Sequence, residues 1–260
     1  MKKYFIIWLT LTSNATQTAF ASRAGALIFL LGKFMRFGFF FFFLFIILAN
    51  TKTLAGYSSQ EVFFFYLTFN LIDTIPQMFF REVYRFREQV VSGNFDYYLI
   101  RPISILFRSL IGGSDILDVP LTGIIIVLLF VIGAGLPGVT FLSVILYLIL
   151  LINALLIALA FHIFVVSLGI LTTEVDNAIM LYRDLTQMGR FPVDIYKEPL
   201  RGVLTFAIPV GIMMTVPAKV LMGIFSWQLL VVSIVVGILF FFISLAFWNH
   251  AIREYSSASS

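Results

Sequence analysis

The 260-residue chain contains no cysteine, only two histidines and few charged residues, which make up 12% of the sequence. Without cysteine there are no disulfides and no thiolate metal ligands. Neither His162 nor His250 lies in the H-E-x-x-H arrangement of zinc proteases, and no G-x-S-x-G nucleophile motif is present. We therefore expect no covalent catalysis and no metal site in this chain.

A phosphate-binding loop of the form G-x-x-x-x-G-K-[ST] is also missing. The sole Gly-Lys pair is Gly32-Lys33, with Leu27 where the motif has its first glycine and Phe34 where it has Ser or Thr. The chain thus lacks the backbone cradle and the hydroxyl that hold phosphates and Mg²⁺. If ATP drives this protein, both ATP and Mg²⁺ are bound by another polypeptide.

The sequence is rich in apolar residues. Hydrophobic residues make up 61% of the chain, against about 45–50% in soluble domains. Several apolar runs reach the roughly 20 residues that a helix needs to cross a bilayer. The sequence predicts an all-α membrane protein, with residues 1–260 as a single transmembrane domain in contact with membrane lipid. In so apolar a chain the net charge of +4 indicates membrane orientation rather than nucleic-acid binding.

Six transmembrane helices are predicted from the apolar runs and their breaks. The run 140–172 is longer than one upright crossing, so it either tilts and projects or contains a break. The charged run 174–190 is expected to pack away from lipid. The six predicted spans are Phe34–Ala49 with a backward extension over Ala24–Leu31, Glu61–Phe80 kinked at Pro76, a third span that begins between Arg108 and Pro120 and ends near Leu136, Thr140–Thr172, Glu174–Arg190 and Ser226–Trp248.

Two further segments are not expected to cross. Residues 1–32 are predicted to be an interfacial helix on the cytoplasmic surface. The alternative is a signal peptide cleaved after Ala19-Phe20-Ala21, although its apolar core, Tyr4–Leu9, is short. Residues 191–223 are interrupted by prolines and predict a re-entrant element, which needs cover from protein or a water-filled cavity. The prolines are Pro192, Pro199, Pro209 and Pro217.

The orientation follows from the distribution of the 17 lysines and arginines. Placing both termini and residues 81–108 on one side leaves Lys52, Arg190, Lys197, Arg201 and Lys219 on the other, with Arg183 inside the fifth span. Both termini are therefore predicted to be cytoplasmic. The eleven cytoplasmic residues are Lys2, Lys3, Arg23, Lys33, Arg36, Arg81, Arg85, Arg87, Arg101, Arg108 and Arg253.

The polar block at residues 81–108 is unlike the rest of the chain. The sequence FREVYRFRE, residues 80–88, alternates charges at the spacing of a solvated surface helix, and Ser92-Gly93-Asn94 favours a turn. Arg101-Pro102 keeps the preceding residue extended and allows a new helix to begin. A helix, a tight corner and a second helix are predicted below the membrane. The simplest interpretation is a charged loop that only fixes the orientation.

A family resemblance favours a different interpretation. Residues 93–102, Gly-Asn-Phe-Asp-Tyr-Tyr-Leu-Ile-Arg-Pro, resemble the G-x-(L/F)-D-x-Y-L-(L/I)-R-P signature of type-2 ATP-binding-cassette exporter permeases with six transmembrane helices. The similarity covers about residues 50–260, and Ala251 departs from the family's usual glycine. Four other segments are similar to the same branch: Leu54–Ser58 with Glu61, Arg190–Tyr196 with Leu200-Arg201, Ile208-Pro209 with Val216–Gly223, and Trp248–Ser260.

The resemblance implies a permease subunit of an ATP-driven exporter in the bacterial cytoplasmic (inner) membrane. It implies that residues 81–108 hold a cytoplasmic coupling helix, which docks on a separate ATPase subunit, and that residues 191–223 form an extracellular re-entrant hairpin. Partners would be ATPase subunits and a second permease, either a copy or a relative. The coupling residues would be Arg85, Arg87, Glu88, Gly93, Phe95, Asp96, Tyr97, Arg101 and Pro102, with Tyr84, Phe86 and Tyr98 as further aromatic anchors.

A polar stripe on the second predicted span offers an alternative function. Asn70, Asp73 and Gln77 recur at helical spacing with Thr74. Asp73 would be the coupling carboxyl of an ion-driven secondary transporter, or it lines a substrate path. The structural interpretation is a helix-to-helix contact, for example with Arg183. A third possibility is a membrane scaffold without transport.

A second pair of carboxylates precedes the third predicted span. Asp115 and Asp118 are three residues apart, so they either hold a cation together or cap the start of the helix and face water.

Overall fold

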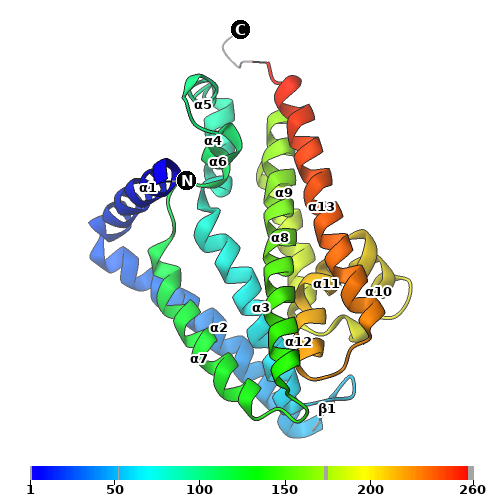
Figure 1. Cartoon of the computed structure of the whole chain (residues 1–260). Coiled ribbons are helices and arrows are strands. Elements are labelled where there is room, and N and C mark those ends of the chain that lie inside the picture. Colours follow the sequence, from blue (N-terminus) through cyan, green and yellow to red (C-terminus); the bar gives the residue numbers. More distant parts are fainter. Residues whose placement is uncertain (1, 52, 173–174, 257–260) are drawn as a thin grey trace.

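The computed structural model describes residues 2–51, 53–172 and 175–256, which form an elongated bundle of helices (Figure 1). The N- and C-termini lie at one end of the bundle, together with three short helices, and we call this the terminal end. A two-stranded hairpin lies at the opposite end, which we call the hairpin end (Figure 1). The three helices are α4 (Phe86–Val91), α5 (Asp96–Ile100) and α6 (Ile105–Leu110), and the strands are β1 (Thr53–Leu54) and β2 (Tyr57–Ser58).

Within the described residues, five helices are long and apolar enough to cross a membrane. This confirms the all-α membrane class. These helices are α2 (Arg23–Thr51), α3 (Ser59–Phe79), α7 (Val119–Ala134) with the 3₁₀ turn η2 (Ile116–Asp118), α8 (Phe141–Thr172) and α13 (Trp227–Arg253).

The fifth predicted span, residues 174–190, is helical where it is described, but the helix is short for a crossing. In the described residues it is represented by α9 (Val175–Gln187) and the 3₁₀ turn η3 (Met188–Arg190). The 13 residues of α9 measure about 20 Å, less than the hydrocarbon thickness of about 30 Å. One face of α9, with Val175, Ile179 and Tyr182, is buried. The predicted count of six spans therefore stays unconfirmed.

The N-terminal helix α1 (Lys2–Ala21) ends eleven residues earlier than the predicted interfacial segment 1–32. A bend at Ser22 separates it from α2, and α2 includes the predicted backward extension. Figure 1 shows α1 at an angle to α2 at the terminal end. No residue of α1 is buried, which fits a helix that lies along a surface.

The hairpin between α2 and α3 determines where α3 begins. Ala55 and Gly56, at the turn, have φ of 53° and 85°, the left-handed values that a two-residue hairpin loop requires. Ser58 then caps α3 by accepting a hydrogen bond from the Glu61 amide, and the Glu61 carboxylate accepts one from the Ser58 amide. Pro76 lies inside α3, as predicted.

Helix α8 is continuous over 32 residues, about 48 Å, so the predicted long run projects beyond the bilayer rather than breaking. It packs along α13 (Figure 1). Gly237 of α13 permits this approach, because a Cβ there would collide with the side chain of Asn153, whose amide donates to the Ser233 carbonyl at 3.0 Å. The α8–α13 pair forms one wall of the bundle.

Residues 191–223 form short elements rather than a crossing, as predicted from the prolines. They pack against α8, and Val210, Met213 and Val220 are fully buried with Ala154 and Ile157. Protein thus covers α11 and α12, whereas most of residues 195–207 are exposed. The elements are η4 (Val193–Ile195), α10 (Leu200–Gly202), η5 (Val203–Ala207), α11 (Val210–Met214) and α12 (Val216–Leu221).

Asp194 holds these elements together. Its carboxylate binds Lys219 of α12 at 2.6 Å and Arg201 of α10 at 3.0 Å, and it accepts a hydrogen bond from the Tyr57 hydroxyl at 2.9 Å. Burial acts to raise the pKa of Asp194, but the hydrogen bond and charge of Lys219 outweigh it, so the pKa lies below its ordinary value.

Candidate coupling surface

The polar block folds as the predicted helix, corner and helix. The 3₁₀ helix η1 (Arg81–Arg85) leads into α4, and Gly93 turns the chain with a φ of 76°. The Phe95 amide donates to the Gln89 carbonyl across this corner at 2.8 Å. Arg101 is extended, with φ of −80° and ψ of 144°, as a residue before proline is expected to be.

The inner face of the block is aromatic and dry. Phe86 and Phe95 are fully buried and meet edge to face at 5.3 Å, and Tyr98 is 5% exposed. They pack against Ile163 and Val166 of α8, among others. The predicted anchors Phe86, Phe95 and Tyr98 therefore fasten the block to the bundle and do not face outward.

Glu82 connects three parts of the block. It is 6% exposed, and its carboxylate accepts hydrogen bonds from the Tyr98 hydroxyl at 3.0 Å and from Arg108 at 2.9 Å. The Arg108 guanidinium also lies 4.7 Å from the centre of the Tyr98 ring. Burial, and then the charge of Glu82, raise the pKa of Tyr98 above its ordinary value. η1, α5 and α6 are thereby joined into one rigid body.

The C-terminal segment clamps the second helix of the block. The Tyr255 hydroxyl donates to Asp96 at 3.0 Å, and its ring meets Phe95 edge to face at 5.0 Å. Trp248 and Ala251 are buried in the same cluster, so the alanine that replaces the family glycine is accommodated. Two segments that share the family resemblance, 93–102 and 248–255, are in contact here.

The outer face of the block carries most of the predicted coupling residues. We call this exposed set the coupling surface. It includes large apolar side chains, among them Tyr97 at 57% exposure and Ile100 at 77%, at the terminal end of the bundle (Figure 1). Exposed apolar groups among charged ones are typical of a protein interface. The coupling surface consists of Arg85, Arg87, Glu88, Val91, Tyr97, Ile100, Arg101 and Pro102.

A hollow of about 400 Å³ adjoins α4 on the coupling surface. Arg85, Arg87 and Glu88 line it together with Asp176 of α9, and Arg87 lies 3.6 Å from Asp176. Both members of this pair are more than half exposed, so water screens the pair and a partner can replace it. Of the predicted set, Phe95 and Asp96 face inward and Gly93 supplies the corner.

Helix α1 is fastened to the end of the block, which the sequence did not indicate. Lys3 donates to the Pro102 carbonyl at 2.6 Å, and the Trp8 indole donates to the Ser114 hydroxyl at 2.9 Å. Gly113, with a φ of 137°, lets α1 approach, because a Cβ there would lie 2.7 Å from the Leu11 carbonyl oxygen. The end of the coupling block and α1 are therefore in direct contact.

The predicted polar stripe of α3 is divided. Asn70 donates to the Tyr66 carbonyl of its own helix at 2.7 Å. Asp73 is 6% exposed and experiences the charges of Arg36, Arg190 and Arg183. Gln77 faces a polar cavity between α2, α3, α7 and α9. Among the described residues no ion pair joins Asp73 to Arg183, so the role of this carboxyl stays a prediction.

Asp115 and Asp118 both pair with Lys33 and are largely buried, so they do not face water as one alternative expected. Lys33 of α2 lies 3.3 Å from Asp115 and 2.5 Å from Asp118. Asp115 also accepts a hydrogen bond from the Leu117 amide at 3.1 Å, which confirms the expected cap. The pair thus attaches α2 to the beginning of α7. Among the described residues no cluster suited to a metal ion is present.

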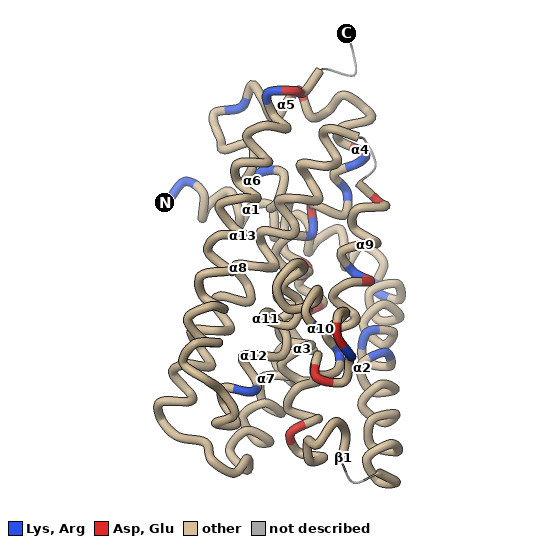
Figure 2. The backbone as a smooth tube through the Cα atoms, turned by 90° about the vertical axis from the view of Figure 1, so that its right-hand side faces the viewer, with Lys and Arg blue, Asp and Glu red and all other residues tan. Residues whose placement is uncertain are grey.

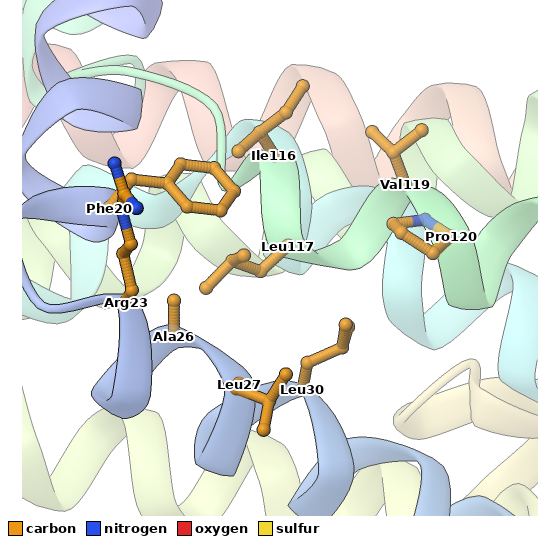
Figure 3. Close-up of a pocket in the computed structure, with 9 residues that line it drawn as sticks. All are labelled: Phe20, Arg23, Ala26, Leu27, Leu30, Ile116, Leu117, Val119 and Pro120. Atoms are coloured by element: carbon orange, nitrogen blue, oxygen red, sulfur yellow. The ribbon is translucent and has the colours of Figure 1, made fainter.

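An apolar groove of about 540 Å³ lies where α1 bends into α2. Figure 3 shows Phe20, Leu117 and Leu30 around a common space, with Arg23 as the charged residue near its rim. The groove adjoins the start of α7, where Val119 and Pro120 complete the lining. This composition suits contact with lipid chains.

The charged residues are unevenly distributed along the bundle. Figure 2 shows most of the lysines and arginines in the half that holds both termini. The predicted grouping of both termini with residues 81–108 matches this arrangement, since all three lie at the terminal end (Figure 1).

These features describe a multi-pass helical membrane protein with an exposed, partly apolar surface at one end. The sequence model of the ABC-2 family transporter protein matches residues 34–259. The chain belongs to this family, whose membership implies an ABC transporter permease that associates with ABC ATPase subunits. A comparison with curated proteins finds no match.

Proposed function

We propose that the chain is the transmembrane permease subunit of an ATP-driven ABC exporter, in which the coupling surface receives the motion of a separate ATPase subunit. The observation that supports this most directly is the contrast between the two faces of residues 81–102. The inner face is buried and tied to three parts of the bundle, whereas the outer face exposes Tyr97 and Ile100 to 57% and 77%. A rigid body with an exposed apolar face is suited to transmit a push.

The proposed assembly has two permeases, either identical or related, and two ATPase subunits in the bacterial cytoplasmic membrane. Both termini and the coupling surface face the cytoplasm, and the hairpin end with residues 191–223 faces outward. ATP and Mg²⁺ are bound by the ATPase subunits, because this chain has no phosphate-binding loop. The chain itself performs no covalent chemistry.

Co-purification tests the proposal. The tagged protein is isolated from solubilised native membranes, and ATP-binding partners are labelled with azido-ATP. We expect a labelled ATPase with the wild type, and at least a tenfold loss when Tyr97→Ala is combined with Ile100→Asp and Arg87→Glu, because the interface loses its apolar centre and gains repulsion.

The matched control is Arg253→Glu, an exposed arginine at the same end but outside the coupling surface. It should retain the ATPase. If the triple variant elutes as a single species and still retains the ATPase, the coupling surface has been assigned wrongly. If the wild type captures no ATPase under conditions that keep membrane complexes intact, the proposed function is refuted.

A further inference from the structure

A polar cavity of about 610 Å³ lies between α2, α3, α7 and α9, and Arg81 and Tyr84 of η1 also line it. Its volume is in the range of small-molecule binding sites. Four cationic side chains line it, against one carboxylate, that of Asp118. The cationic residues are Lys33, Arg36, Arg81 and Arg183.

The positive charge of this cavity is only partly compensated. Lys33 is paired with Asp115 and Asp118, and Arg81 lies 3.9 Å from Asp115. Among the described residues, Arg36 and Arg183 have no carboxylate within 4.0 Å, and both are exposed. The cavity therefore offers two guanidinium groups with free donors.

The position of Arg36 makes this charge costly. It lies about 20 Å from Arg23 and about 22 Å from Thr51, the ends of α2. It is therefore close to the middle of an apolar, membrane-length helix, and not at the cytoplasmic end where the charge distribution predicted it. An arginine at that depth must face water, protein or an anion rather than lipid. Asp73 cannot neutralise Arg36 alone, because Arg190 and Arg183 act on the same carboxyl.

The remaining lining is partly apolar. Ile28 and Phe29 of α2 and Leu121 of α7 adjoin the arginines, and Ile28 and Phe29 are 68% and 42% exposed. A ligand that satisfies this cavity has an anionic group for the guanidinium pair and an apolar part beside α2. A free inorganic anion would contact the cationic side chains but not the apolar ones, and a cation would be repelled.

We propose that this cavity binds the anionic headgroup of an amphiphile, such as a phosphate monoester on an alkyl chain, with Arg36 and Arg183 as its main ligands. Guanidinium groups suit phosphate because they donate two parallel hydrogen bonds. As the substrate class of the exporter, this assignment rests on the proposed function, whereas binding itself requires only the permease.

Binding is measured by titration calorimetry on the whole protein in phosphatidylcholine nanodiscs, with empty nanodiscs subtracted. The probes are dodecyl phosphate, inorganic phosphate and dodecyltrimethylammonium. We expect saturable binding of dodecyl phosphate, at least tenfold weaker binding of inorganic phosphate and none of the ammonium compound. Tight binding of inorganic phosphate alone, or equal binding of both amphiphiles, would overturn the proposal.

Variants locate the site. Arg36→Gln and Arg183→Gln should each weaken dodecyl phosphate binding about tenfold or more, because each removes charge-assisted hydrogen bonds. Arg183→Lys keeps the charge and should lose less affinity for dodecyl phosphate. The control Arg253→Gln should bind like the wild type. Unchanged binding by the double glutamine variant would refute the assignment.

Two further outcomes separate the anion site from a permease interface and from the proposed ATPase coupling. Loss of dimerisation in the glutamine variants without any wild-type binding of dodecyl phosphate would assign the arginines to a permease interface, against the proposal. Because no ATPase is present in the titration, its result does not depend on the coupling surface. Failure of the pull-down with intact dodecyl phosphate binding would refute the proposed function and leave the anion site standing.

Discussion

At the scale of single residues, the polar groups of the coupling block hold it together and are not spread along a loop. Glu82, Tyr98 and Arg108 form a partly buried hydrogen-bond network. Gly112 must lack a side chain, because a Cβ there would collide with the Glu82 carboxylate. Sequence alternation predicted a solvated helix at residues 80–88. The alternation is present, but one member of the charged series, Glu82, is buried.

Glu82→Ala should destabilise the protein by about 3 kcal/mol, because it leaves Arg108 partly buried without its carboxylate. Glu88→Ala, six residues later and exposed, should change stability by less than about 0.5 kcal/mol. Thermal unfolding in detergent, followed by fluorescence, measures both. Equal melting temperatures for the two variants would mean that the Glu82 network contributes nothing to the block.

At the scale of elements, small residues decide how closely helices approach. Gly237 sits opposite Asn153, at the place where α13 crosses α8. In membrane helices such small residues permit backbone approach, and polar side chains then hydrogen-bond across the gap.

Gly237→Ala should cost about 1–3 kcal/mol, since the added methyl displaces the Asn153 side chain. Asn153→Ala removes the obstacle, so the double variant should lose less stability than the two single variants together. Unfolding of all four proteins in the same detergent forms the double-mutant cycle. Strict additivity would show that the two side chains do not compete for one space.

The packing of residues 191–223 is expected to depend on ionisation of Asp194. Because its pKa is lowered in the folded protein, the stability that it provides is complete above about pH 4, the unfolded value, and is lost as the pH falls through the lower folded pKa. Proteolysis of residues 191–223 should therefore accelerate on acidification below about pH 4.

Asp194→Asn provides the test of that cause. It should be cleaved faster than the wild type at neutral pH, and the difference should shrink at low pH, where the wild-type carboxyl is protonated too. Asp184→Asn, which changes an exposed carboxyl of α9, serves as the control. If acidification accelerates proteolysis equally in the wild type and in Asp194→Asn, a group other than Asp194 causes the pH dependence.

At the scale of the whole molecule, both termini and the coupling block share one end, and the β1–β2 hairpin occupies the other (Figure 1). Helix α1 contacts the block near Pro102 and Ser114, so the terminal end forms one connected assembly. The lysine and arginine distribution predicted the grouping but not this contact.

The absence of cysteine makes the orientation directly measurable. Single variants Ser92→Cys and Ser256→Cys should react with a membrane-impermeant maleimide only from the cytoplasmic side, and Thr53→Cys only from the opposite side. All three positions are exposed. The unmodified chain provides a background without label. Reaction of Ser92→Cys from the outer side would invert the topology and remove the basis for ATPase docking.

Several features followed from sequence because their causes are local. Apolar run length determined the membrane class, prolines predicted the interruption of residues 191–223, and Gly93 with Arg101-Pro102 predicted the corner of the coupling block. Such features depend on the bilayer thickness and on backbone sterics, which a stretch of neighbouring residues reveals.

Tertiary structure alone decided which polar groups meet. Lys33 pairs with Asp118, Tyr255 with Asp96, and Arg36 and Arg183 converge on one cavity. These partners are far apart in the chain, and charge or spacing within one segment carries no information about its distant neighbour. Packing also decided the surroundings of α9: its buried face lies against α8, a contact that hydropathy does not record.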